Sequence, residues 1–260
     1  MPRFEPHPPV RAAVVTGASS GIGRATAEAL AAAGHPVVLG ARRLDRLQEV
    51  AEGITDAGGA AVALPLDLAD DRSIDQFAAE AEEEVGPIEV LVSSAGDVYP
   101  ATALAVEPAE FARQVQVNVI GAHRLVRRLG PPMVERARGD IVFVTSDVVR
   151  VPRTHLAAYV TAKHALEGLA RAMQMELEGT GVRVGIVRPG PAATEQQATW
   201  PAEVLDEVLA EWTRWGIVRH PGYLRPKDVA RAVHTVVSMP RGTHLTLLEV
   251  EPEAPVEEQA

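Results

Sequence analysis

The chain has 260 residues, no cysteine and a net charge of −10, and these values exclude several classes of protein. Without cysteine there are no disulfides, no thiolate catalysis and no cysteine-ligated zinc, and an acidic chain lacks the basic surface with which proteins bind nucleic acid. There is no run of 18 apolar residues, no signal-peptide segment in the proline-rich start, and no HxH or HExxH spacing among the eight histidines. We therefore expect a cytoplasmic protein that binds no membrane, no nucleic acid and no metal.

Short apolar segments alternate with helix-length segments along the chain, which is typical of βαβ units around a parallel sheet. The predicted strands are 12–16, 36–40, 60–64, 88–92, 140–145, 182–187 and 245–250. The predicted helices are 22–33, 42–56, 71–85, 108–128, 156–178 and 226–238, and the pattern is loose between Pro189 and Tyr223. The alternation predicts an α/β fold with one parallel sheet of seven strands.

The two ends of the chain differ in composition from the rest. Residues 1–10 contain four prolines, and the segment from Glu249 to Ala260 contains five glutamates and two prolines. Segments of this kind are rarely ordered. We expect a disordered segment over 1–10, one domain over 11–250 and an acidic flexible tail over 251–260.

A glycine-rich turn directly follows the first predicted strand and opens into an alanine-rich helix. It reads Thr16-Gly17-Ala18-Ser19-Ser20-Gly21-Ile22-Gly23. Glycines let the backbone turn tightly and approach a pyrophosphate, whose charge then lies at the helix N-terminus. The turn therefore indicates a dinucleotide site, with a plain tight βα turn as the alternative.

Lysine is rare in this chain, and its position is informative. Only two of the 25 basic residues are lysines, and Lys163 lies four residues after Tyr159. On a helix such residues share one face, and a unit charge roughly 5 Å from a phenolate would bring a phenol pKa from about 10 toward 8. Tyr159 could then act as a general acid or base, although the pair alone fits a solvated helix face equally well.

Together the TGxxxGxG turn and the YxxxK pair resemble the short-chain dehydrogenases/reductases, over about residues 11 to 250. The resemblance implies a single-domain, doubly wound Rossmann-type fold with helices on both faces, which uses NAD(H) or NADP(H). It also implies a catalytic tetrad of Asn118, Ser146, Tyr159 and Lys163. Tyr159 would exchange a proton with the substrate oxygen that Ser146 steadies, Lys163 would lower the pKa of Tyr159 and bind the nicotinamide ribose, and Asn118 would hold a relay water. The reaction expected is carbonyl/alcohol interconversion.

The residues after the second predicted strand bear on the choice of cofactor. Arg42 and Arg43 stand where an acidic residue would bond the ribose hydroxyl of NAD, and a guanidinium suits the 2′-phosphate of NADP. We therefore expect NADP(H) rather than NAD(H). By resemblance the other cofactor contacts are Gly17, Ser19, Ser20, Gly21, Ile22, Gly23, Asp67, Leu68, Ser94, Ala95, Gly96, Tyr159, Lys163, Pro189, Gly190 and Thr194.

One of these positions has an alternative role, and another departs from the family pattern. Asp67 could equally cap the helix that starts near Asp71. The family usually shows Asn-Asn-Ala-Gly where this chain reads Ser93-Ser94-Ala95-Gly96, so the amides that pin the central strands are missing here.

All three tryptophans lie in the segment from Glu195 to Tyr223, which selects the substrate in the family. Trp212 and Trp215 share a helical face that could form a lid, and the predicted substrate contacts are Ser146, His155, Tyr159, Trp200, Trp212 and Trp215. The expected substrate is a hydrophobic ketone, a 3-oxoacyl compound or a hydroxy acid. Ordinary lid packing or a subunit contact is the alternative use of the tryptophans.

The resemblance also implies self-association as a tetramer or dimer, through the helices that carry Asn118 and Tyr159. The alternative to an enzyme is a catalytically silent NADP(H)-binding sensor or scaffold of the same fold. The complete tetrad favours the enzyme, because a protein that only binds the cofactor needs no such set.

Overall fold

The computed structural model describes residues 5–197 and 200–256, and its centre is a single parallel sheet. The strands are β1 (Ala12–Thr16), β2 (Val37–Ala41), β3 (Ala61–Pro65), β4 (Ile88–Ser93), β5 (Gly139–Val144), β6 (Val182–Pro189) and β7 (Leu247–Val250). They follow the order β3-β2-β1-β4-β5-β6-β7, and each neighbouring pair is parallel. The predicted seven-stranded parallel sheet is confirmed.

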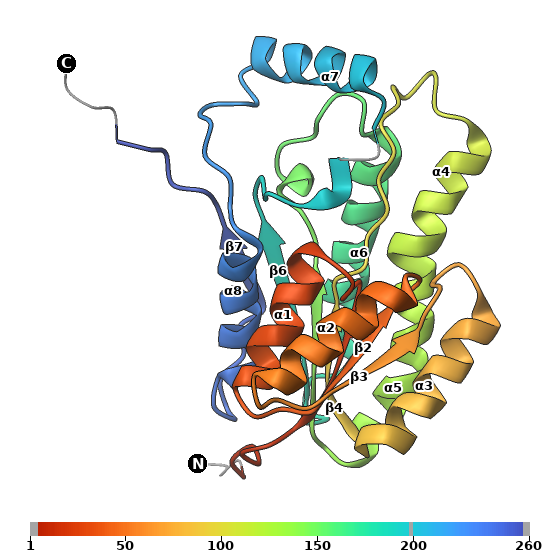
Figure 1. The fold of residues 1–260 in the computed structure, drawn as a ribbon, viewed down its shortest axis with the longest axis vertical. Helices are drawn as coiled ribbons and strands as arrows, with labels where there is room; N and C mark the ends of the chain where they lie inside the picture. Colours follow the sequence, from red (N-terminus) through yellow and green to blue (C-terminus); the bar gives the residue numbers. More distant parts are fainter. Residues whose placement is uncertain (1–4, 198–199, 257–260) are drawn as a thin grey trace.

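Helices cover both faces of the sheet (Figure 1). They are α1 (Gly21–Ala32), α2 (Leu44–Asp56), α3 (Asp71–Val85), α4 (Pro108–Val115), α5 (Ala122–Glu135), α6 (Ala157–Glu176), α7 (Ala202–Arg214) and α8 (Pro226–Ser238). Successive strand residues point to opposite faces. Val14 accordingly packs in the cluster that includes α3, α5 and α6, whereas Val15 packs with α1, α2 and α8. The doubly wound Rossmann-type architecture is therefore confirmed.

The segment predicted as one helix over 108–128 differs from the prediction in its middle and at its end. A π-helical turn, Gln116–Gly121, separates α4 from α5, and α5 continues to Glu135 through Pro131 and Pro132. Leu129 and Met133 are both buried, so packing offsets the backbone hydrogen bonds that proline removes. The π-helical turn carries Asn118, in keeping with the frequency of such turns at functional sites.

The described parts of both chain ends contact the domain. Residues 5–10 form no helix or strand, but His7 Nε2 lies 2.9 Å from Arg183 Nη2. At the other end, Glu251 accepts a hydrogen bond from Arg150 at 2.6 Å. Residues 1–4 and 257–260 lie outside the described residues, and flexibility of the two ends stays a prediction. None of the described helices combines the length and the apolar character that crossing a membrane requires.

The sheet brings the carboxyl ends of its strands to one edge of the molecule. The strand order reverses between β1 and β4, and ligands of open α/β sheets bind outside the carboxyl ends of the strands at such a point. Helix α7 lies at the end of the molecule opposite the N-terminus (Figure 1). It helps to line a cavity that also contacts the ends of β5 and β6.

Candidate active site

The glycine turn after β1 is shaped by close backbone contacts. Gly17 has φ +69°, and a Cβ there would lie 2.8 Å from Ala95 Cα; a Cβ on Gly23 would lie 2.4 Å from Gly17 O. Neither position tolerates a side chain. Ser20, the N-cap of α1, makes no side-chain capping hydrogen bond. The first-turn amides of α1 are thus left to bind an anion from outside the helix.

Arg43 lies beside this helix start. Its Nη2 donates hydrogen bonds to Ser19 Oγ at 3.1 Å and to Ser20 Oγ at 2.9 Å. Its Nη1 lies 3.3 Å from Glu195 Oε2, which also accepts a 2.7 Å hydrogen bond from Arg46. The structure therefore joins the end of β2, the glycine turn and the segment after β6 around one exposed cationic group.

The other residues predicted to contact the adenosine half lie near the same edge. Arg42 is exposed, and its positive charge acts on the carboxyl of Asp97. Asp67 accepts a hydrogen bond from Ala69 N at 2.9 Å and so stabilises its own turn, while Asp70 is the residue that caps α3. Leu68 is buried in the core.

The turn after β4 is held by side chains other than the expected asparagines. Thr16 Oγ1 accepts hydrogen bonds from the backbone N–H groups of Ser94, at 3.1 Å, and Ala95, at 3.0 Å. Asn118 holds the backbone of Asp97 in the same turn: its Nδ2 donates to Asp97 O at 2.8 Å, and its Oδ1 accepts from Asp97 N at 3.2 Å. A threonine and one distant asparagine thus supply the pinning that Ser93 and Ser94 do not.

The four residues of the predicted tetrad gather at the ends of β4 and β5. Asn118, Ser146, Tyr159 and Lys163 are all buried. A Cβ on Gly96 would lie 3.3 Å from Asn118 Oδ1 and 3.6 Å from Lys163 Nζ. Lys163 Nζ donates to Val144 O at 3.1 Å and lies 5.5 Å from the centre of the Tyr159 ring. The sequence order Asn, Ser, Tyr, Lys therefore folds into one constellation.

Burial dominates the acid–base properties of this constellation. It raises the pKa of Tyr159 to about 12, although a hydrogen bond with Ser146 lowers that pKa. Burial also lowers the pKa of Lys163 to about 8, against the charge of Glu167, which raises it. The predicted phenol pKa near 8 is therefore wrong, because desolvation of the phenolate outweighs the effect of the lysine charge.

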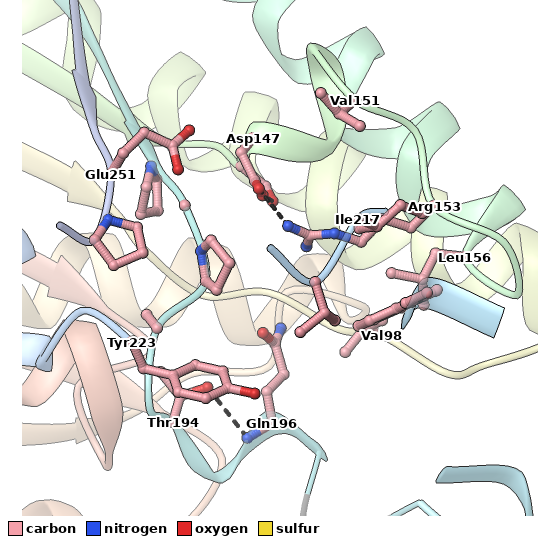
Figure 2. A pocket seen from close by; sticks show the side chains of 18 of the residues that line it. Val98, Asp147, Val151, Arg153, Leu156, Thr194, Gln196, Ile217, Tyr223 and Glu251 are labelled. Atoms are coloured by element: carbon pink, nitrogen blue, oxygen red, sulfur yellow. Dashed lines mark hydrogen bonds and ion pairs between the residues drawn. The ribbon is translucent and has the colours of Figure 1, made fainter. Parts of the chain in front are cut away.

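A cavity of about 340 Å³ opens beside the tetrad. It is lined by residues from both predicted sites, namely Ile22, Ser94, Gly96, Ser146, Tyr159, Lys163, Pro189, Gly190, Thr194, Trp200 and Trp212. Figure 2 shows Val98, Leu156 and Ile217 on its apolar side, with Asp147, Arg153 and Glu251 facing it as charged groups. The cavity thus joins the candidate cofactor edge to a half-apolar chamber under α7.

Two residues predicted to contact substrate lie outside the cavity lining. Trp215 is 63% exposed and stacks on Arg214, whereas Trp212 and Val208 are buried. Trp215 lies at the C-cap of α7, and its exposure shows that it does not share the buried environment of Trp212. His155 is buried against Glu207 and Glu211 of α7 rather than against the cavity.

Several polar residues of the site were not singled out in the sequence. Asp147, beside Ser146, forms an ion pair with Arg153 that is marked in Figure 2, and burial raises the Asp147 pKa. The Gln196 side chain also acts on Tyr159 and lowers its pKa. For Asp147 and Arg153 the available signal was one acidic residue and two arginines, Arg150 and Arg153, within a short and otherwise apolar loop.

Comparison with known proteins agrees with this geometry. A family model described as short chain dehydrogenase matches residues 11–204. The chain belongs to the short-chain dehydrogenase family. Membership makes it an oxidoreductase of the class that acts on CH–OH donors.

Among curated short-chain dehydrogenases, 2,3-dihydro-2,3-dihydroxybenzoate dehydrogenase of Bacillus subtilis is 33% identical over 240 residues, which cover 90% of this chain and 91% of that protein. Glycine betaine reductase ATRR of Emericella nidulans is 33% identical over 243 residues, which are 93% of this chain. The chain spans only 19% of that second protein's length.

Solved short-chain dehydrogenase structures superpose closely on this one. A putative NAD(P)-dependent gluconate 5-dehydrogenase from Beutenbergia cavernae, with bound NADP, is 36% identical with a TM-score of 0.80, covering 93% of this chain and 95% of its own. A 3-ketoacyl-(acyl-carrier-protein) reductase from Brucella melitensis, complexed with NADH, is 29% identical with a TM-score of 0.81, covering 93% and 96%. These neighbours support a nicotinamide cofactor.

Proposed function

We propose that this short-chain dehydrogenase interconverts a carbonyl compound and a secondary alcohol with NADP(H), using Tyr159 as the general acid–base. One observation carries the proposal: Tyr159, Ser146 and Lys163 line a cavity that also reaches the glycine turn, and Asn118 is buried beside them. A residue set used only for binding does not require a buried phenol, hydroxyl and ammonium at one point. In the reducing direction, Tyr159 Oη gives its proton to the substrate oxygen as that oxygen gains negative charge.

The neighbours of Tyr159 have distinct roles in this proposal. The Ser146 hydroxyl donates a hydrogen bond to the substrate oxygen and stabilises its developing charge. Lys163, whose Nζ lies 5.5 Å from the Tyr159 ring centre, offsets the negative charge that the lost proton leaves on the phenol. Asn118 holds the backbone at Asp97 in place. A bound nicotinamide would supply or accept the hydride.

The residues at the cofactor edge fit a dinucleotide that carries a 2′-phosphate. The uncapped start of α1 would hold the pyrophosphate through Gly21, Ile22 and Gly23. Arg43, fixed by Ser19 and Ser20, would bind the 2′-phosphate, with Arg42 adding positive charge. The other groups proposed to hold the cofactor are Gly17, Asp67, Leu68, Ser94, Ala95, Gly96, Lys163, Pro189, Gly190 and Thr194.

The chamber under α7 suits a substrate with an apolar body. Leu156, Trp200, Leu209, Trp212 and Ile217 line it, so a hydrophobic ketone, a 3-oxoacyl compound or a hydroxy acid fits its chemistry. We also propose a cytoplasmic enzyme that self-associates as a dimer or tetramer through the helical segments carrying Asn118 and Tyr159. Ile120 and Met175, which are exposed apolar residues on these segments, support that interface.

Tyr159→Phe tests the mechanism, because it removes the hydroxyl and keeps the ring. We expect the variant to lose turnover across a panel of ketones and alcohols while it binds NADPH nearly as well as the wild type. Tyr99→Phe, at an exposed tyrosine, is the matched control and keeps full activity. Undiminished turnover by Tyr159→Phe would overturn the mechanism, and a lower KM for NADH than for NADPH would overturn the cofactor assignment.

A further inference from the structure

Three side chains of types that can bind metal ions meet where α7 contacts the loop that leads into α6. His155 Nδ1 lies 3.5 Å from Glu211 Oε2, and His155 Nε2 lies 3.6 Å from Glu207 Oε1. One ligand atom from each residue can be chosen so that all three lie within 4.8 Å of one another. Glu207 and Glu211 are one turn apart on α7 and share a face. This His155–Glu207–Glu211 cluster lies outside the lining of the cavity.

The state of His155 indicates a ligand that is not part of the protein. Its side chain is only 8% exposed, and among the described residues Nδ1 has no hydrogen-bond partner. The backbone at His155 has φ +62°, a region unusual for a residue other than glycine. That conformation is held by a 2.7 Å hydrogen bond from Ala101 N to His155 O. A strained backbone thus aims a buried imidazole, whose Nδ1 makes no hydrogen bond, at two carboxylates.

The distance between the loop and α7 is set by contacts on either side of the cluster. Trp212 Nε1, next to Glu211, donates a 3.1 Å hydrogen bond to Thr154 O, next to His155. The Arg153 guanidinium lies 5.3 Å from the centre of the Trp212 ring. Packing therefore holds the imidazole near the carboxylates, whose side chains are 65% exposed for Glu207 and 38% exposed for Glu211 and are free to adjust to a ligand.

The charges and donor types of the cluster fit a divalent transition-metal ion. Two carboxylates four residues apart on a helix repel each other, and a cation between them removes that repulsion. Imidazole nitrogen and carboxylate oxygen are both donors that zinc uses, and water can complete the coordination of three protein ligands. We propose that His155, Glu207 and Glu211 bind one Zn²⁺-like cation that ties α7 to the loop before α6.

Such an ion would act on the substrate chamber through the elements that it joins. Leu156 follows His155 directly and lines the cavity, as does Trp212, which follows Glu211. A bound cation therefore fixes two walls of the chamber relative to each other without entering it. The same cation also stabilises the folded chain, because the unfolded chain does not bring the three ligands together.

Titration with Co²⁺, a spectroscopic substitute for Zn²⁺, tests the site by a readout independent of turnover. Tag-free protein is stripped with a chelator and titrated at neutral pH, and Zn²⁺ is then added as a competitor. We expect the wild type to bind one Co²⁺ per chain, and Glu207→Gln/Glu211→Gln to bind it at least tenfold more weakly. At a tenfold excess of Zn²⁺ over its Kd, the Tm of the wild type should rise by about 3 °C.

The matched control changes the same number of charges on the same helix. Glu203→Gln/Asp206→Asn alters two exposed acidic residues of α7 outside the cluster, and it should bind Co²⁺ as the wild type does. Because Glu207 and Glu211 reach solvent, their amide variants should fold even if a His155 variant does not. The proposal is overturned if Glu207→Gln/Glu211→Gln retains wild-type binding, if the control pair loses binding equally, or if the wild type shows no saturable binding.

Discussion

Arg188 donates hydrogen bonds to both carboxylate oxygens of Glu167, at 2.9 Å from Nε and 2.7 Å from Nη2. Thr145 adds a third hydrogen bond at 2.9 Å. Burial alone would raise the Glu167 pKa, but the hydrogen bonds from Arg188 and Thr145 outweigh it and lower the pKa. Glu167 therefore stays anionic one helical turn after Lys163, where its charge opposes the loss of the Lys163 proton.

Glu167→Gln should change the pH dependence of the enzyme, because it removes this charge and keeps the size of the side chain. Without the carboxylate the Lys163 pKa falls further, so we expect the alkaline limb of the kcat/KM profile to move to lower pH. Breaking the buried pair with Arg188 should also lower the free energy of unfolding by about 3 kcal/mol. Glu176→Gln, at an exposed position of the same helix, is the control. An alkaline limb that does not move would show that Glu167 is only structural.

Lys163→Met should alter how stability depends on pH. The Lys163 pKa is about 8 in the folded chain, below its ordinary value of 10.5. Between these pH values the unfolded chain binds more protons, so wild-type stability rises as pH increases from about 8 to 10.5. This rise is absent from Lys163→Met. From pH 7 to 9.5, we expect the wild type to gain about 2 kcal/mol relative to the variant.

Urea unfolding at the two pH values measures this difference directly. The Tyr159 pKa is raised to about 12, so Tyr159 stays protonated throughout this range and does not obscure the lysine. If the two proteins show parallel pH dependence, the Lys163 ammonium is not destabilised by burial.

Trp212→Ala and Trp215→Ala should differ sharply in their effect on stability, although the two residues are only three positions apart at the C-terminal end of α7. Trp212 is 5% exposed, bonds Thr154 and packs edge-on against Trp200 with ring centres 6.5 Å apart. Its removal should lower the free energy of unfolding by about 3 kcal/mol and raise the substrate KM. Trp215 is 63% exposed, and its removal should change stability by less than about 0.5 kcal/mol. Equal effects of the two variants would contradict the burial pattern.

The contrast between the tryptophans shows what the sequence could predict. The alternation of apolar runs and helices sufficed for the seven parallel strands, because the pattern is local and the five inner strands are almost wholly buried. The glycine turn and the order of Asn118, Ser146, Tyr159 and Lys163, through their resemblance to the family, predicted four residues that are buried close together in the structure. The exposure of Trp215 depends on where α7 ends, and helical spacing within a short segment does not define that end.

Pairings between distant segments were beyond the sequence pattern. Thr16 pins the turn after β4 from a different strand, and His155 meets Glu207 from across the fold. No spacing rule relates such residues, because only the packed sheet and helices bring them together. The desolvation that raises the Tyr159 pKa is likewise a property of the assembled core, so arithmetic on one charge pair predicted a shift in the wrong direction.

Arg43→Leu should lower activity with NADPH much more than activity with NADH. Arg43 is the guanidinium that Ser19 and Ser20 hold beside the start of α1. Losing charge-assisted hydrogen bonds to a 2′-phosphate costs about 1.5–3 kcal/mol, so kcat/KM for NADPH should fall about 10- to 100-fold while that for NADH changes little. Arg24→Leu, at an arginine of α1 that pairs with Glu28 instead, is the control. An equal loss for both cofactors would contradict a role in phosphate recognition.

Glu195→Gln tests the role of Arg43 in a second way, by removing the carboxylate that pairs with it. The Glu195 carboxylate accepts from Arg43 and Arg46, and the hydrogen bonds from these arginines lower its pKa. The anionic Glu195 therefore competes with a 2′-phosphate for the Arg43 guanidinium. Removing its charge should lower the KM for NADPH a few-fold and leave that for NADH unchanged, because only the phosphate competes with it. Combined with Arg43→Leu, the substitution should lose its effect; a benefit that persists in the double variant would mean that Glu195 acts on another group.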